Sequence, residues 1–128
     1  MNSLVIDATS TKIFLVIINS KNIYTSTHEN SKSNFDKLTI FINDFLKNNE
    51  ISINKIDQIY VNRGPGSFAG IRNSLSIVKA LHFVNKIDYF CFSFQDFSKE
   101  IDIKYENIPN LCKKFKIKKN LIKPIYMS

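Results

Sequence analysis

The sequence predicts an α/β protein with a mixed five-stranded β-sheet and packed helices, in the order β-β-β-α-β-α-β. Three observations support this fold class. Short apolar runs bounded by polar turns fill the first 30 residues, two later stretches carry apolar residues at helical spacing, and a loop rich in glycine precedes the second stretch. With 128 residues, of which 44% are hydrophobic, the chain can bury one core. We therefore expect a single subdomain.

Five segments of strand length are recognisable along the chain. The expected strands are Leu4–Asp7, Lys12–Asn19, Asn22–Thr27, Ile59–Val61 and Tyr89–Phe94. Residues 19–22 are polar and read as a hairpin turn between the second and third strands. The first three strands are therefore expected to form an antiparallel meander.

Two helices are predicted from apolar residues that recur at three- and four-residue spacing. The first is expected to be capped by Ser33 or Asn34 and to end near residues 48–49. Its apolar positions are Phe35, Leu38, Ile42, Phe45 and Leu46. The apolar positions of the second are Phe68, Ile71, Leu75, Val78, Leu81 and Phe83. Residues 95–101 are expected to add a short third helix.

A glycine-rich loop joins the fourth strand to the second helix, and it allows three interpretations. A phosphate-binding P-loop is excluded because Gly70 is followed by isoleucine where that motif needs lysine. Gly64, Gly66 and Ala69 fit the degenerate dinucleotide pattern, but Asp88 precedes the next apolar run instead of ending it. The third interpretation is that the glycines serve packing alone.

The loop also carries a family resemblance. Residues 63–72 resemble the TsaB signature RGPGSFTG(I/L)R, with Ala69 in place of threonine. TsaB proteins are bacterial proteins needed to make threonylcarbamoyladenosine in tRNA. Residues 4–11 resemble the opening of the family, where Ala8 replaces a threonine, and residues 92–93 resemble a strand end that usually reads Val-Ser-Ser.

The resemblance covers about residues 2–98 and implies a fold. Residues 1–98 are expected to form a TsaB-like N-terminal subdomain of the actin-like, sugar-kinase-like type. Family members are longer, with a second half that closes a cleft against the first, so residues 99–128 are expected to be a short basic C-terminal extension left from that half. Residues 123–128 resemble the Pro-x-Tyr-Leu-Arg ending of the family, which favours internal loss. A lone subdomain has no closed nucleotide cleft, so independent kinase or ATPase activity is not expected.

The resemblance also implies a function, that of a non-catalytic scaffold. TsaB-like proteins pair with the catalytic paralogue TsaD through two helices of this subdomain and support threonylcarbamoyl transfer to adenosine 37 of tRNA. No cofactor is expected on this chain alone, because ATP and metal are expected on partner subunits. A TsaE-like ATPase is a further candidate partner, and contact with tRNA is expected to be indirect. Without TsaD, the exposed apolar helix faces are expected to pair with a second copy as a homodimer.

The expected partner surface consists of the two helices and the glycine loop. Its residues are Leu38, Ile42, Arg63, Gly64, Pro65, Gly66, Ser67, Phe68, Gly70, Ile71, Arg72, Ser74, Leu75 and Val78. Small residues of the second helix, Gly70, Ser74, Ser76 and Ala80, would let another helix approach closely. Core packing is the alternative for any one of these residues.

Positive charge is concentrated near the C-terminus. Residues 99–128 contain 8 lysines and 3 acidic residues, in a chain of net charge +7. The candidate tRNA contacts are Lys113, Lys114, Lys116, Lys118 and Lys119, with Phe115 available for stacking. A solvated face is the alternative.

Two other functions stay open for the chain. One is a small nucleotide-binding enzyme that uses the glycine loop, and the other is an independent basic nucleic-acid-binding module.

Other candidate sites are weak, and no catalytic residue or metal site is expected. His28 and His82 lack neighbours at metal-ligand spacing. Asp7 could hold Mg²⁺ in an actin-like ATPase, but a cap for the turn that follows it is favoured. Cys91 and Cys112 are isolated, which favours buried thiols over a disulfide or a zinc site. No targeting or membrane-spanning segment is recognisable, so a cytoplasmic location without membrane contact is expected.

Overall fold

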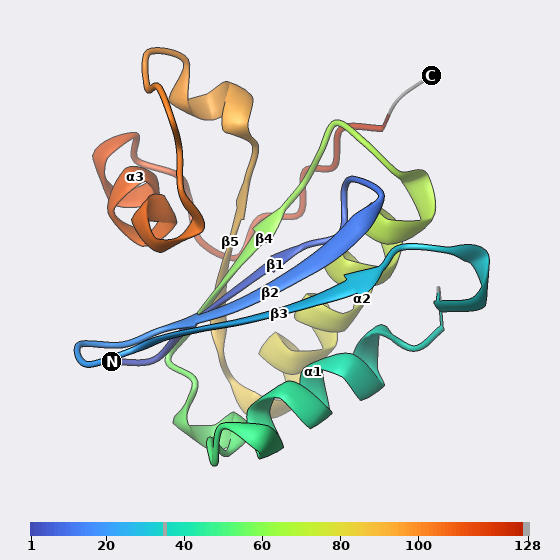
Figure 1. Ribbon diagram of the computed structural model, residues 1–128. Coiled ribbons are helices and arrows are strands. Elements are labelled where there is room, and N and C mark those ends of the chain that lie inside the picture. Colours follow the sequence, from blue (N-terminus) through green and yellow to red (C-terminus); the bar gives the residue numbers. More distant parts are fainter. Residues whose placement is uncertain (35, 127–128) are drawn as a thin grey trace.

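The computed structural model describes residues 1–34 and 36–126, and Phe35, which was assigned to the first helix, lies outside them. Its centre is a five-stranded sheet in the order β3-β2-β1-β4-β5 (Figure 1). The strands are β1 Ser3–Asp7, β2 Lys12–Ile18, β3 Ile23–Glu29, β4 Gln58–Asn62 and β5 Asp88–Phe92. β1, β2 and β3 pair antiparallel, whereas β4 pairs parallel to both β1 and β5. The predicted mixed sheet and its opening meander are confirmed.

The hairpin between β2 and β3 turns at the predicted place because Asn19 closes it. The Asn19 side-chain oxygen accepts hydrogen bonds from the backbone N–H groups of Lys21 and Asn22, at 2.9 and 2.8 Å. An asparagine that binds the backbone two residues ahead is a common turn former. The turn sets the register in which Ile17 lies opposite Tyr24.

Two helices, α1 Leu38–Asn48 and α2 Phe68–Asn85, cover one face of the sheet. Their apolar stripes meet strand residues such as Leu4, Ile6 and Val61 in the larger of two buried clusters. Burial of this apolar surface supplies the main driving force for the fold.

The start predicted for the first helix is wrong. A 3₁₀ turn occupies Lys32–Asn34, and α1 begins only at Leu38. The Asn34 side chain donates to the carbonyl oxygen of Glu29 at 2.8 Å. This bond ties Asn34 to the end of β3, so its side chain points back to the strand instead of capping the helix.

Phe83 does not belong to the apolar stripe of α2, because its side chain is 77% exposed. The buried stripe runs through Ile71, Leu75 and Val78, and one further turn reaches His82. The His82 ring nitrogen Nδ1 lies 2.9 Å from the carbonyl oxygen of Ile87, just beyond the end of the helix. His82, and not Phe83, therefore occupies the last position of the inward-facing stripe of α2.

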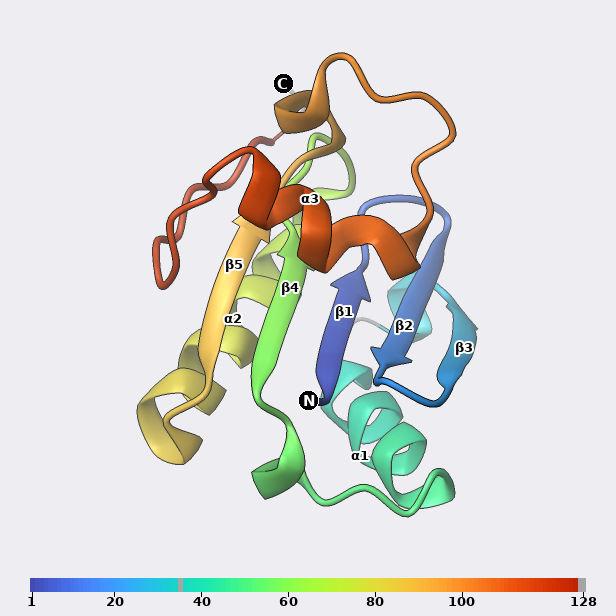
Figure 2. The same cartoon turned by 90° about the vertical axis from the view of Figure 1, so that its left-hand side faces the viewer.

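The other face of the sheet is covered by α3, Ile108–Lys114, which the sequence did not reveal (Figure 2). Ile108 and Cys112 of α3 join Tyr60 and Phe92 in the second buried cluster. The short helix expected at residues 95–101 is only a 3₁₀ turn, Phe94–Phe97.

β5 ends two residues earlier than predicted because a capping box begins at Ser93. The Ser93 backbone N–H donates to Asp96 at 2.8 Å, and the Ser93 hydroxyl accepts from Gln95 at 3.2 Å. These bonds turn the chain away from the strand.

After α3, the chain returns along the edge strand β5 to the N-terminal end of α2. The backbone N–H of Asn120 donates to the carbonyl oxygen of Tyr89 at 2.7 Å, and the backbone N–H of Ile125 donates to the carbonyl oxygen of Arg63 at 2.7 Å. Residues 119–126, called here the C-terminal strap, therefore reach the glycine loop. None of the helices in the described part of the chain has the length and apolar character that a bilayer-spanning helix requires.

Candidate functional site

The glycine loop begins where β4 ends and stops where α2 is capped. Gly64 has a φ of 109°, in the region that favours glycine, and its N–H donates to the Asn62 side chain at 2.9 Å. The peptide between Gly64 and Pro65 is cis. At the other end, the Ser67 hydroxyl accepts from Gly70 N–H at 3.2 Å and caps the helix.

Each glycine of the loop packs against another part of the backbone. A Cβ at Gly64 would collide with the carbonyl oxygen of Ile125 in the C-terminal strap. At Gly66 it would meet the carbonyl of Thr9, and at Gly70 that of Ala8. The loop is therefore filled by its own chain, which supports the packing interpretation over a phosphate cradle.

Arg63 connects three segments at the mouth of the loop. Its guanidinium donates to Asp96 at 2.7 Å and 3.4 Å and to the carbonyl oxygen of Lys123 at 3.1 Å. The backbone N–H of Arg63 donates to the carbonyl oxygen of Phe92 at 2.7 Å. The planar fork of arginine suits this double contact with a carboxylate. Arg63 thus fixes the strap and the capping box to the end of β4.

Asp7 is buried and fully engaged at the end of β1. One carboxylate oxygen accepts from Thr9 N–H at 3.0 Å and from the Thr9 hydroxyl at 2.7 Å. The other accepts from Asn62 at 3.1 Å and from the Tyr105 hydroxyl at 2.7 Å. Burial and the neighbouring Asp7 raise the pKa of Tyr105, so its hydroxyl stays a donor. The predicted role of Asp7 as a cap for the following turn is confirmed.

These residues do not fit a bound nucleotide and its metal ion. All four donors around Asp7 occupy the positions that a cation would need, and Ile125 lies against Gly64 where a phosphate would approach. Within residues 1–34 and 36–126, no group of three or more His, Cys, Asp or Glu side chains could hold a metal ion.

Most helix residues expected at a partner surface face the core instead of solvent. Six of them are 5% exposed or less, namely Leu38, Ile42, Ile71, Ser74, Leu75 and Val78. An apolar stripe at this spacing turns toward the sheet that it covers. Phe68 and Arg72 are exposed, and the guanidinium lies 5.8 Å from the Phe68 ring centre. Contact of any of these residues with a partner stays a prediction.

The outward residues of the same helices form a different set. We call this set the outer helix face, and it consists of Thr39, Ile40, Asn43 and Lys47 of α1 with Ser76, Lys79, Ala80 and Phe83 of α2. A hollow of about 200 Å³ lies between the helices and is lined in part by Thr39 and Ser76. The sequence signal for this face is the small pair Ser76 and Ala80, one helical turn apart on the side away from the buried stripe.

The candidate lysines lie on and after α3, on the opposite side of the sheet. Lys114 pairs with Glu100 at 2.6 Å, and Lys119 lies 3.5 Å from Asp88. In the part of the chain that the structure describes, Lys113, Lys116 and Lys118 form no salt bridge. Their contact with tRNA stays a prediction.

Both cysteines are free and buried, as the sequence predicted. Burial raises the pKa of the Cys91 thiol to about 11 and that of Cys112 to about 12. They are therefore protonated near neutral pH and do not act as thiolates.

Comparison with known proteins gives a family match and one curated relative. Residues 27–93 match the model of the family TsaD, described as tRNA N6-adenosine threonylcarbamoyltransferase. The tRNA threonylcarbamoyladenosine biosynthesis protein TsaB of Buchnera aphidicola subsp. Baizongia pistaciae is 35% identical over 63 residues, which cover 42% of this chain and 28% of that protein.

Similar solved structures support the fold. YeaZ from Pseudomonas aeruginosa matches with a TM-score of 0.66 and 20% identity, over 72% of this chain and 43% of YeaZ. RuvC from T. thermophilus, in complex with a Holliday junction substrate, matches with a TM-score of 0.53 and 10% identity over 90% of each chain. The present chain thus spans less than half the length of the TsaB and YeaZ proteins that it matches.

Proposed function

Because this chain belongs to the TsaD family of tRNA N6-adenosine threonylcarbamoyltransferases and is a TsaB-like protein, we propose that it is a non-catalytic scaffold subunit of threonylcarbamoyladenosine synthesis. In this proposal it binds a TsaD-like protein and supports modification of tRNA at adenosine 37. The observation that carries the proposal is the outer helix face of α1 and α2.

The outer helix face combines small side chains with exposed apolar ones. Ile40 is 55% exposed and Phe83 is 77% exposed, whereas Ser76 and Ala80 present little bulk between them. Exposed apolar side chains gain free energy when a partner covers them, and small side chains let two helices pack at short interaxial distance. A helical partner surface of complementary shape is therefore the occupant that we propose.

The chemistry of the reaction is assigned to partner subunits. The carboxylate of Asp7 is saturated with donors, and Ile125 blocks the glycine loop, so neither supports a nucleotide step on this chain. ATP and a metal ion would then be held by the TsaD-like protein, with a TsaE-like ATPase as a further partner. A role in tRNA modification implies a cytoplasmic setting.

The test uses size-exclusion chromatography with light scattering on this chain co-expressed with the TsaD-like protein of the same source. Ser76→Arg adds bulk and charge to the outer helix face without touching the core. Ser98→Arg makes the same change at an exposed position after β5 and is the matched control. Leu75→Asp is unsuitable, because Leu75 is only 5% exposed and the variant would lose core packing.

We expect a 1:1 complex for the parent chain and for Ser98→Arg, and an affinity lower by about tenfold or more for Ser76→Arg, since one clashing side chain at a helix contact costs about 1–3 kcal/mol. Circular dichroism should show that both variants remain folded. No complex with the parent chain, or equal affinity for both folded variants, would refute the proposed surface.

A further inference from the structure

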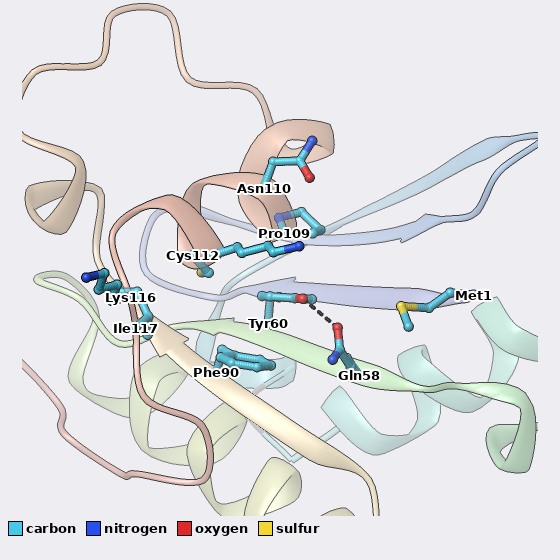
Figure 3. Close-up of a pocket in the computed structure, with 10 residues that line it drawn as sticks. Met1, Gln58, Tyr60, Phe90, Pro109, Asn110, Cys112, Lys116 and Ile117 are labelled. Carbon is cyan, nitrogen blue, oxygen red and sulfur yellow. Dashed lines mark hydrogen bonds between the residues drawn. The ribbon is translucent and has the colours of Figure 1, made fainter.

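A cavity of about 490 Å³ lies between α3 and the second face of the sheet, away from the outer helix face (Figure 3). Tyr60 of β4 and Phe90 of β5 lie on its sheet side. Asn110 and Lys113 come from α3, and Lys116 follows the helix. The fold and the proposed partner contact leave this cavity without a role.

The sheet side of the cavity is aromatic. Tyr60 and Phe90 are directly paired across the parallel strands, and their rings stack with centres 5.0 Å apart and planes 11° apart. The Tyr60 hydroxyl donates to Gln58 at 2.7 Å, so its polar atom is satisfied. Burial raises the pKa of Tyr60 to about 12, which keeps the ring uncharged. Phe90 is only half-buried and therefore offers ring surface to a flat ligand.

The rim of the cavity is cationic. Lys113 and Lys116 line it, and no acidic residue does. Neither lysine forms a salt bridge among residues 1–34 and 36–126. The two ammonium groups are thus available to an anionic ligand.

A second hollow, of about 270 Å³, adjoins the first at the shared residues Lys116 and Ile117 and reaches Cys91, which belongs to the cluster on the helix-covered face of the sheet. It is also lined by Lys118 and Lys123, and its one carboxylate, Asp96, is paired with Arg63 at 2.7 Å. The two hollows together present a lysine-lined surface, and the aromatic pair lies in the first hollow only.

We propose that this surface binds single-stranded nucleic acid, with a base against Phe90 and backbone phosphates at Lys113, Lys116 and Lys118. Aromatic rings beside lysines are the usual means of holding an unpaired strand, because bases stack on the rings and cations neutralise phosphates. A mononucleotide would use only one hollow, and a duplex keeps its bases stacked inside. The inference goes beyond the proposed partner contact and does not depend on it, since none of the residues that line the two hollows belongs to the outer helix face.

The test measures fluorescence anisotropy of a labelled single-stranded RNA of about 12 nucleotides, with a DNA of the same sequence, the RNA duplex and free adenosine monophosphate in parallel. Phe90→Leu keeps an apolar side chain but removes the ring, and should weaken strand binding by about fivefold or more. Lys113→Gln with Lys116→Gln should lower the slope of log affinity against log salt by about 1.4, because each phosphate that a lysine no longer neutralises lowers it by about 0.7.

The matched control is Lys47→Gln with Lys79→Gln, which removes the same charge from the outer helix face and should leave the slope nearly unchanged. RNA held more tightly than DNA would identify the strand as RNA, and equal binding would support single strands in general. The proposal is overturned if no strand binds, if the duplex binds as tightly, if only the mononucleotide binds, or if both lysine pairs act alike.

If Phe90→Leu does not fold, the exposed lysine pairs decide the question alone. If the chain binds the single strand but not the TsaD-like protein, only the proposed partner surface is refuted. If it binds the TsaD-like protein but not the single strand, only the present inference is refuted.

Discussion

At the scale of single residues, the loop that resembles a ligand-binding motif packs against its own chain. Gly64, Gly66 and Gly70 leave room for the carbonyl groups of Ile125, Thr9 and Ala8, whereas the guanidinium of Arg63 holds Asp96 and the strap. The motif residues therefore stabilise the junction of β4 and α2, so changes there should act first on stability.

Gly64→Ala tests this packing role. The new Cβ would collide with the Ile125 carbonyl, and φ at this position is 109°, so we expect a loss of more than about 1 kcal/mol in the free energy of unfolding. Urea denaturation measures this difference. Asn43→Ala, on the exposed side of α1, should stay within about 0.5 kcal/mol of the parent chain. Equal stability of the two variants would contradict the packing role.

Arg63→Lys tests the other anchor of the loop. Lysine keeps the charge but cannot make both bonds to Asp96 and also reach the carbonyl of Lys123, and we expect a loss of about 1.5–3 kcal/mol in the free energy of unfolding. Lys37→Arg, the reverse exchange at an exposed position, is the control and should be neutral. If Arg63→Lys is as stable as the parent chain in urea, the strap is held by other contacts.

At the scale of elements, the sequence predicts the strands and helices that have a regular apolar pattern, but it does not predict contacts between distant parts of the chain. The strands and α2 could be predicted because their apolar periods are clear, and the turn at Asn19 has a local cause. α3 was missed because it has only 7 residues and Pro109 opens it, beside lysines that read as a solvated tail. The contact of Ile125 with Gly64 joins positions far apart in the chain, and no local pattern reveals it.

The free energy of unfolding should fall at alkaline pH because of buried groups on the α3 side of the sheet. Burial raises the pKa values of Tyr60 and Cys112 to about 12, from 10.0 and 9.0, and also raises that of Tyr105. The unfolded chain then releases these protons first, so their contribution is complete below about pH 9 and is lost as pH rises through the folded pKa values. Urea denaturation from pH 8 to 11 should show the fall in stability.

Tyr105→Phe isolates one of these groups. The variant loses the hydrogen bond to Asp7, and its stability should fall less steeply above pH 10 than that of the parent chain. Tyr126→Phe, at an exposed ring away from Asp7, is the matched control and should follow the parent curve. Identical slopes for both variants would show that Tyr105 does not contribute to the alkaline loss.

At the scale of the whole molecule, one sheet separates two surfaces. Figure 2 shows α3 on one face of the sheet and α1 and α2, which carry the outer helix face, on the other. The aromatic, lysine-rimmed cavity lies between α3 and the sheet. Residues 99–128 were predicted to be a basic extension, of which residues 127–128 lie outside the described part of the chain, and the segment around Ile108 and Cys112 packs on this same sheet. Their separate origin, with a boundary at residue 98, stays a prediction.

The separation predicts that the two surfaces act independently. Ser76→Arg should leave affinity for the single strand within about twofold, and Lys113→Gln with Lys116→Gln should leave affinity for the TsaD-like protein within the same range, because effects at distant sites are usually additive. Anisotropy and light scattering on the same preparations measure both. Loss of both affinities in one folded variant would show that the surfaces overlap.

The most direct test of the partner surface is hydrogen–deuterium exchange of this chain with and without the TsaD-like protein. We predict that binding slows exchange in peptides from residues 38–48 and 68–85, which contain α1 and α2, and leaves residues 105–119 unchanged. A complex that instead slows exchange only in residues 105–119 would contradict the account, because the partner would then occupy the α3 side of the sheet.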